Sequence, residues 1–218
     1  MIFPKVLLWD IDGTLIDTTS LIVSALDHVY IKFIGRTISA DEIRAIIGTP
    51  LSEQVQFLGE PSDYGTTISE MESEFIRYYE ANRNQERILS DVVDILIAGK
   101  RAGRPIALVT SKNHEEIENT LPRLGILDYV DLVITADDVA NPKPDPEGIS
   151  KALAHFSVSG SDAIFIGDTV HDMRAGQSGG VQTCAVTWGA GSLSLLTAEN
   201  PDHICSSPAE LRDVLGLS

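Results

Sequence analysis

Short, continuously apolar runs recur along the chain, and from Ser90 onward they alternate with helical patterns. Runs that are apolar at every position are typical of strands buried on both faces of a sheet. Strands and helices in alternation predict a parallel sheet with right-handed crossover helices. The predicted strands cover residues 6–9, 106–109, 130–134, 163–166 and 183–187, with a weaker one around Ile204.

The segment from Thr18 to about Arg87 breaks this alternation, because it shows helical periodicity and no strand pattern. Apolar residues at helical spacing and a capping box of Ser39 with Glu42 predict several amphipathic helices there. The predicted fold is therefore α/β: a Rossmann-like parallel sheet flanked by helices, with an inserted α-helical cap domain. We expect residues 1–17 and 90–218 to form the core domain and residues 18–89 the cap. Ligands of open α/β sheets bind at the carboxyl ends of the strands, so a cap inserted after the first strand is placed to cover the site.

Composition narrows the classes of partner and compartment. The 218 residues are 43% hydrophobic and carry a formal net charge of −16, which disfavours nucleic acid and anionic membrane surfaces as partners. The two cysteines are too few for a disulfide framework. The first ten residues have neither a signal-peptide layout nor the length of a membrane span. We therefore expect a cytoplasmic protein.

The residues that follow the predicted strands are unusually acidic. A single aspartate at a strand end is most often a helix cap or a turn former. Several carboxylates in one crevice repel each other by about 4 kcal/mol per pair at 4 Å and an effective dielectric near 20, so such a cluster needs a cation. Oxygen ligands favour Mg²⁺, and a lysine can contact both a carboxylate and a phosphate. The candidate residues are Asp10, Asp12, Thr110, Ser111, Lys143, Asp168 and Asp172.

The spacing of Asp10 and Asp12 suggests a division of labour between them. Two residues apart on a continuing strand, their side chains would share a face, and Gly13 permits the turn that ends the strand. We hypothesise that Asp10 attacks phosphorus covalently while Asp12 donates a proton to the leaving oxygen and then activates water. Thr110 and the backbone amides near Asp12, Gly13 and Ser111 would hold the transferring oxygens.

Four segments in this order, WDIDGTLIDT, ALVTSK, NPKPDPEG and FIGDTVHDMRAG, resemble the four motifs of the haloacid dehalogenase superfamily, in its capped phosphatase branch. The resemblance covers nearly the whole chain. It implies that Asp10 is the nucleophile, Asp12 the acid/base, Thr110 the second-motif hydroxyl and Lys143 the third-motif lysine. It also implies a Mg²⁺ site made by the Asp10 carboxylate, the Asp12 carbonyl and Asp168, with Asp172 acting partly through water.

Within the superfamily, IIGTPL in the cap and AVTWGAGS near the C-terminus look most similar to phosphoglycolate phosphatases and their relatives, which include an inorganic pyrophosphatase branch. The resemblance implies that Gly48 and Thr49 approach the substrate. The alternative is a simple turn in which Thr49 caps a helix that starts at Pro50. Ser111 stands where many relatives have asparagine. The expected partner is a small phosphorylated substrate, a phosphoglycolate-like phosphomonoester.

Three rival functions remain open on these residues. An inorganic pyrophosphatase would share every core motif. A phosphomutase similar to β-phosphoglucomutase usually carries a glutamate where this chain has Gly167. A receiver-like phospho-aspartate switch would lack both the acid at position 12 and the helical insertion. Hydrolysis is therefore the preferred interpretation.

Several other residues have a structural interpretation as well as a functional one. His171 lies between two candidate acids, yet on a helix it need not face a metal. Cys184 is interpreted as a buried small hydrophobe. Aromatic residues of the cap are expected in its core, and the arginines of the cap are expected to be exposed. These residues are Phe75, Tyr78 and Tyr79, and Arg44, Arg77 and Arg87.

Overall fold

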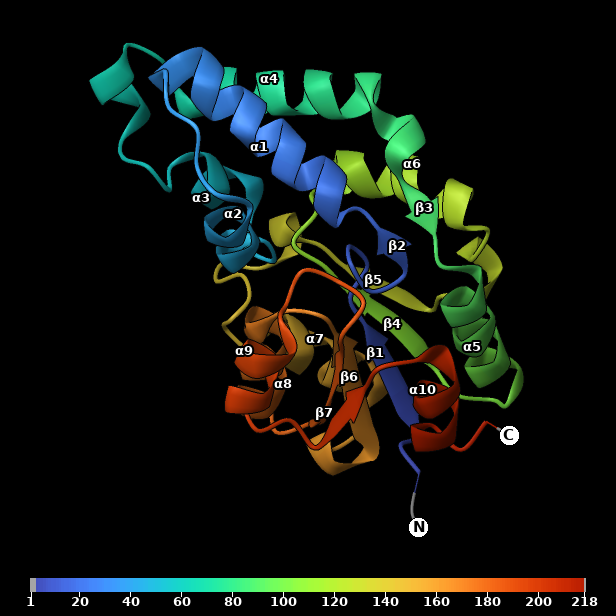
Figure 1. Ribbon diagram of the computed structural model, residues 1–218. Coiled ribbons are helices and arrows are strands. Elements are labelled where there is room, and N and C mark those ends of the chain that lie inside the picture. The colour runs from blue at the N-terminus through green and yellow to red at the C-terminus, as the bar shows by residue number, and fades with distance from the viewer. Residues whose placement is uncertain (1–2, 218) are drawn as a thin grey trace.

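The computed structural model describes residues 3–217, and its centre is a six-stranded parallel sheet (Figure 1). The strand order is β5-β4-β1-β6-β7-β8, and every pair of neighbours is parallel. This confirms the predicted sheet. The strands are β1 (Val6–Trp9), β4 (Ile106–Val109), β5 (Leu132–Ile134), β6 (Ala163–Gly167), β7 (Gln182–Val186) and β8 (His203–Cys205).

Successive residues of each central strand point to opposite faces, and both faces are buried. Leu7 and Trp9 belong to one apolar core, whereas Val6 and Leu8 belong to the other. The first core packs against α5 (Ser90–Arg101), α6 (His114–Leu124) and α10 (Pro208–Val214). The second packs against α7 (Glu147–Phe156) and α8 (Val170–Ser178), with α9 (Leu193–Ala198) beside α8. The core is therefore the Rossmann-like α/β layer structure that the pattern predicts.

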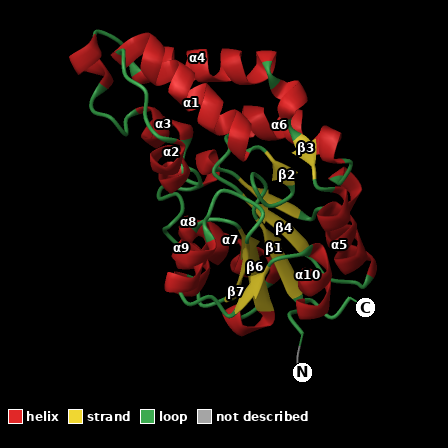
Figure 2. Ribbon diagram, in the orientation of Figure 1, coloured by secondary structure: helices red, strands yellow, loops and turns green. Residues whose placement is uncertain are grey.

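A helical lobe with its own apolar core, here called the cap, stands over the carboxyl ends of the strands (Figures 1 and 2). Its helices are α1 (Thr19–Ile34), α2 (Ala40–Ile46), α3 (Leu51–Val55) and α4 (Ile68–Ala81). The fully buried Leu26, Val29, Tyr30, Ile43 and Met71 fill it. Short 3-10 helices lie at η1 (Pro61–Tyr64), η2 (Arg83–Gln85), η3 (Leu127–Tyr129), η4 (Ala136–Asp138) and η5 (Gly160–Asp162).

Helix starts follow local capping chemistry. The capping box of Ser39 with Glu42 opens α2, as expected from the sequence. The sequence Asp145-Pro146-Glu147 predicts a helix with Asp145 as its N-cap and Pro146 as its first residue, but in α7 Pro146 is the N-cap and the helix begins at Glu147. The Asp145 carboxylate still accepts a hydrogen bond from the Glu147 amide, at 2.9 Å.

A small antiparallel ribbon joins the cap to the core. Its strands are β2 (Ile16–Asp17) and β3 (Arg87–Ile88), and an ion pair of 3.2 Å links Asp17 to Arg87. The sequence pattern predicts no strand here, because two residues are too few to show a period. The segment that enters the cap and the segment that leaves it are therefore paired with each other.

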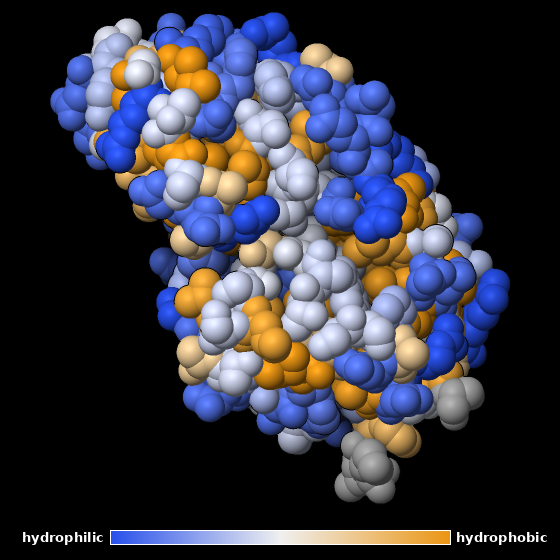
Figure 3. Space-filling model, in the orientation of Figure 1, coloured by the Kyte–Doolittle hydropathy of each residue, from blue (hydrophilic) through white to orange (hydrophobic). Residues whose placement is uncertain are grey.

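The surface is mixed in character. Blue, hydrophilic residues cover much of the view in Figure 3, with orange patches on both the cap and the core. Within residues 3–217, the helices are all too short or too polar to reach across a membrane.

Candidate active site

Polar side chains follow three adjacent strands at the edge of the sheet that faces the cap. Asp10 follows β1, Thr110 follows β4 and Asp168 follows β6. Since β4 and β6 flank β1, these residues meet at one place. All three are buried. The structure therefore brings together side chains that lie up to 158 positions apart in the sequence, which is the separation of Asp10 and Asp168.

Lys143 is the buried cation of this cluster. Its Nζ donates to Asp10 Oδ1 at 2.6 Å and to Asp172 Oδ1 at 2.7 Å, and it lies over the ring of Phe165. Burial alone would lower the pKa of Lys143, but the negative charges of Asp10 and Asp172 outweigh burial and raise the pKa above its usual value. Lys143 is thus held as an ammonium between two carboxylates.

Asp10, Asp168 and Asp172 form an acidic cluster in which one carboxylate oxygen of each lies within 4.8 Å of the others. Burial, with the charges of Asp172 and Asp12, raises the pKa of Asp10 to about 7 even though Lys143 opposes the shift. Burial also raises the pKa of Asp168, with Asp10 and Asp172 adding to it. Three carboxylates face one ammonium, so a cation would relieve the repulsion that remains. An all-oxygen donor set suits a hard divalent ion such as Mg²⁺.

The partners of Asp172 suggest that it positions Lys143. Its Oδ1 accepts from Lys143, while its Oδ2 accepts from the Thr169 amide at 3.0 Å and the Thr169 hydroxyl at 2.6 Å. Thr169 and Asp172 make a capping box at the start of α8. The spacing T-x-x-D of these two residues is typical of such a box. Asp172 is fixed from both sides.

Asp168 sits in a close-fitting cradle of small residues. Thr14 Oγ1 donates to its Oδ1 at 3.1 Å, and the Ala190 amide donates to its Oδ2 at 2.7 Å. A Cβ added at Gly13 or at Gly189 would lie 2.1 Å from Asp168 Oδ2, so glycine is required at both positions. The Gly13 amide donates to the Ile16 carbonyl at 2.7 Å, so what Gly13 contributes here is space rather than a free donor. Gly189 and Ala190 belong to the segment AVTWGAGS, which the family resemblance includes, so the sequence contained an indication that they lie near the site.

Asp12 lies beside Asp10 at the floor of a cavity, although β1 ends at Trp9 and does not continue through both acids. Asp12 Oδ2 is 2.9 Å from Lys112 Nζ, and Asp12 Oδ1 is buried with no hydrogen-bond partner among residues 3–217. Lys112 is not among the candidate residues predicted from the sequence. The signal was its position, two residues after Thr110 and so close to the same strand end.

The cavity has a polar floor and an apolar roof. Asp10, Asp12, Thr110, Ser111, Lys112 and Glu116 line it from the core, and Gly48, Thr49 and Gln54 line it from the cap. Apolar side chains of the cap close it from above: Ile22, Ile47, Leu51, Phe75, Ile76 and Tyr79. Phe75 and Tyr79 belong to the cap core, as expected, and they also form part of this wall, which the sequence did not indicate.

The loop that joins α2 to α3 docks on the core. Ser111 Oγ donates to the Gly48 carbonyl at 2.5 Å, so this hydroxyl is already engaged with the cap. Gly48 has φ of +103° and packs against Thr169. The alternative of Thr49 as a helix cap is wrong, because Pro50 is the N-cap of α3 and the Thr49 hydroxyl donates back to the Ile46 carbonyl.

This docking gives a testable expectation. At Gly48 a Cβ would lie 2.8 Å from Thr169 Oγ1, so we expect Gly48→Ala to displace the loop and lower kcat/KM by about 10-fold or more. Gly35 is the matched control, because it also has positive φ but nothing within 4 Å of its Cβ position. Gly35→Ala should cost about 1 kcal/mol of stability and leave kcat/KM unchanged. Equal losses of kcat/KM in the two variants would contradict the docking role.

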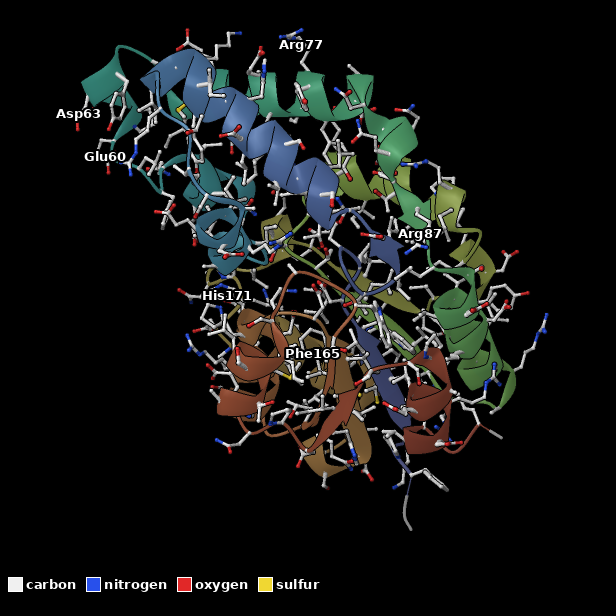
Figure 4. All side chains as sticks on the ribbon, in the orientation of Figure 1. Glu60, Asp63, Arg77, Arg87, Phe165 and His171 are labelled. Carbon is white, nitrogen blue, oxygen red and sulfur yellow. The ribbon has the colours of Figure 1, made fainter. Side chains whose placement is uncertain are left out.

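The remaining candidates lie outside the cavity. Arg77 pairs with Glu74 and points outward from α4, and Arg87 pairs with Asp17 on the ribbon (Figure 4). Arg44 pairs with Asp41 and is exposed. His171 lies on α8, where burial lowers its pKa and so favours the neutral ring. Cys184 is buried, as expected.

A parallel α/β core whose strand ends gather acids and a lysine beneath a helical cap has its candidate active site where open α/β sheets bind ligands. The chain belongs to the haloacid dehalogenase-like hydrolases, because the sequence model of that family matches residues 7–186. This makes the chain an enzyme, and the receiver-like switch is set aside.

Similar proteins agree with this assignment. The chain is 31% identical over 217 residues to pyrophosphatase PpaX of Bacillus velezensis, covering 97% of this chain and 96% of that protein. It is 29% identical over 210 residues to pyrophosphatase PpaX of Bacillus cereus, covering 95% and 94%. A solved structure from Haemophilus somnus, described as a predicted phosphoglycolate phosphatase, superposes with a TM-score of 0.84 at 21% identity, covering 98% and 99%. That last likeness shows the shared fold.

Proposed function

We propose that this protein is a Mg²⁺-dependent phosphatase that hydrolyses a small phosphorylated metabolite, a phosphoglycolate-like phosphomonoester, through an aspartyl phosphate on Asp10. The observation that carries the proposal is the placement of Asp10. Its carboxylate is held by Lys143 at 2.6 Å, lies within the acidic cluster, and lines the cavity under the cap. A nucleophile, a counter-charge and a space for substrate therefore coincide.

In the first step, an oxygen of Asp10 bonds to phosphorus as the bond from phosphorus to the leaving oxygen breaks. The electron pair goes to the leaving oxygen, which takes a proton from Asp12. In the second step Asp12 takes a proton from water, whose oxygen bonds to phosphorus while the bond to Asp10 breaks. Thr110 lies beside Asp10 at the end of β4, so its hydroxyl is assigned to the transferring oxygens.

The metal assignment rests on the donor set and the charge of the cluster. We assign Asp10, the Asp12 carbonyl and Asp168 as direct ligands, with Asp172 acting through water. The bonds of both Asp172 oxygens to Lys143 and Thr169 agree with this indirect role. When bound, Mg²⁺ supplies positive charge to the oxygens of the transferring phosphoryl group.

The cap, assigned to residues 18–89, is proposed to close over the substrate and exclude water, with the ribbon near Asp17 and residues 87–90 as its hinge. In the closed form the loop at Gly48 and Thr49 covers the phosphoryl site, and Ser111 holds that loop. The backbone near Ser111 is assigned to the phosphate, and Gly13 supports the site by leaving room for the Asp168 carboxylate.

Inorganic pyrophosphate is the second candidate substrate, because the two relatives described above are named pyrophosphatases and the match covers nearly their whole length. A phosphomutase is disfavoured by Gly167. A Cβ there would lie 2.5 Å from Asp172 Cγ, so the glutamate of the mutases would displace an acid of the cluster.

A panel of phosphorylated metabolites tests the proposal. We expect phosphate release with Mg²⁺ from phosphoglycolate or pyrophosphate in preference to sugar phosphates and nucleoside monophosphates. Transfer of the phosphoryl group to a sugar instead of water would favour the mutase. No release from any member of the panel would contradict the proposal.

Removal of divalent ions should abolish turnover. Since several carboxylates then face the phosphate without a counter-ion, we expect chelation to lower the rate by about 100-fold or more, and added Mg²⁺ to restore it. Phosphate release is measured before chelation, after it, and after re-addition. Full activity in protein shown to be metal-free by elemental analysis would rule out the assigned ion.

A further inference from the structure

Lys112 is the single cation among the residues of the 3–217 range that line the cavity. Its side chain is largely buried, and its Nζ lies 2.9 Å from Asp12 Oδ2. Its backbone is held on both sides, since its amide donates to Thr110 Oγ1 at 3.2 Å and its carbonyl accepts from the Ala136 amide at 2.9 Å. The ammonium group is thus fixed near the proposed proton donor.

The acids around Lys112 have partners of their own. Glu86 pairs with Arg123 and accepts from the Tyr79 hydroxyl at 2.5 Å. Glu116 accepts from the Asn113 amide at 2.9 Å in the capping box that opens α6. Asp12 is therefore the acid that Lys112 contacts directly, and the cavity lies beside this pair.

Apart from Lys112, the described lining holds neutral polar groups at Thr49, Gln54 and Ser111 and a further acid at Glu116, but no second cation. Ile22, Ile47, Leu51 and Phe75 line the cap side, and an ionised group against them would lose its hydration without compensation. Among the described residues that line this cavity, Lys112 is the cation that can balance a negative charge on the leaving side of the substrate, because Lys143 is shared by Asp10 and Asp172.

We propose that Lys112 determines specificity by binding an anionic group on the leaving side of the substrate, a role that rests on the proposed function. Asp12 Oδ2 is 2.9 Å from Nζ, and a hydrogen bond from the same carboxyl oxygen to the leaving oxygen adds about 3 Å, so Nζ lies within about 6 Å of the leaving oxygen. An anionic group that is hydrogen-bonded to Nζ then lies within about 9 Å of that oxygen. The substrate class is therefore a compact one, with a carboxylate or a second phosphate a few bonds from the scissile bond. Sugars and nucleosides would place their hydroxyls or bases against apolar walls.

Substrates matched in shape test this role. Phosphoglycolate carries a carboxylate, glycolamide phosphate replaces it with a neutral amide, and pyrophosphate carries the second phosphate. In Lys112→Met we expect kcat/KM to fall about 10- to 100-fold for the anionic substrate that the wild type prefers, the loss typical of one charge-assisted hydrogen bond. For glycolamide phosphate, kcat/KM should change less than about 3-fold. For the anionic substrate, Lys112→Arg should retain most of the wild-type kcat/KM. Whichever of phosphoglycolate and pyrophosphate loses more kcat/KM in Lys112→Met identifies the group that Lys112 binds, a carboxylate or a phosphate.

Lys100→Met is the control variant, because Lys100 forms a surface pair with Asp131 far from the cavity. It should leave kcat/KM for every substrate unchanged. Equal losses of kcat/KM for anionic and neutral substrates in Lys112→Met would overturn the proposal, since they would show that Lys112 acts only by holding Asp12. A wild type that does not distinguish phosphoglycolate from glycolamide phosphate and does not hydrolyse pyrophosphate would overturn it as well.

Binding separates this proposal from the catalytic one. In an Asp10→Asn background, calorimetry should show that Lys112→Met weakens the binding of phosphoglycolate or pyrophosphate by the same 10- to 100-fold. This measurement needs no turnover. Unchanged binding of both anions would overturn the role of Lys112 even if the wild type proves to be a phosphatase, whereas absent hydrolysis with selective loss of binding would contradict only the proposed function.

Discussion

Asp10→Asn is expected to lower kcat by about four orders of magnitude or more, because an amide oxygen cannot form the aspartyl phosphate on which the proposed pathway depends. The fold should survive the change. An asparagine oxygen can still accept the hydrogen bond that Lys143 donates to Asp10 at 2.6 Å. Phosphate release with Mg²⁺ under saturating substrate measures the effect.

Asp63→Asn, on an exposed turn of the cap, is the matched control for the same chemical change (Figure 4). It should retain full activity. If Asp10→Asn kept more than about a tenth of the wild-type rate, a covalent role for Asp10 would be excluded, because general effects of lost charge are far smaller than loss of the nucleophile.

Lys143→Met is the second large effect, and it acts on stability as well as on rate. In metal-free protein without the ammonium, Asp10 and Asp172 face each other in a buried site with no counter-charge. Breaking a buried ion pair by removal of one partner costs about 3–5 kcal/mol. We expect a loss of unfolding free energy in that range, together with loss of turnover. Urea unfolding followed by circular dichroism gives the first quantity.

Lys151→Met provides the comparison. Lys151 makes an exposed pair with Glu147 one helical turn away, and such pairs contribute less than about 1 kcal/mol. If Lys143→Met destabilised the protein no more than Lys151→Met, the central position of Lys143 in the cluster would be contradicted.

The parallel sheet could be predicted because burial on both faces leaves a local signature. The segments 6–9 and 106–109 are apolar at every position, and β1 and β4 have those bounds. The run at 130–134 is less clear, and β5 begins only at Leu132 after the 3-10 helix that ends at Tyr129. The ribbon of β2 and β3 could not be predicted, because each strand has only two residues and the pairing joins residues some 70 positions apart.

The composition of the site was predictable to a similar degree. Residues at strand ends must meet at one edge of a parallel sheet, so Asp10, Thr110 and Asp168 could be grouped from the sequence alone. The pairing of Lys112 with Asp12 could not, because a lysine side chain reaches many directions from one backbone position. The hydrogen bond from Ser111 to the Gly48 carbonyl depends on how the cap docks, and no local pattern encodes that contact.

The measurement that tests this account most directly is the location of the phosphoryl group during turnover. Protein mixed with substrate labelled in the transferred phosphate is quenched in acid within milliseconds, and its peptides are mapped by mass spectrometry. The account predicts label on the peptide that contains Asp10, with its loss on treatment with hydroxylamine and its absence in Asp10→Asn. Rapid phosphate release with no label on Asp10, or label on another residue, would contradict it.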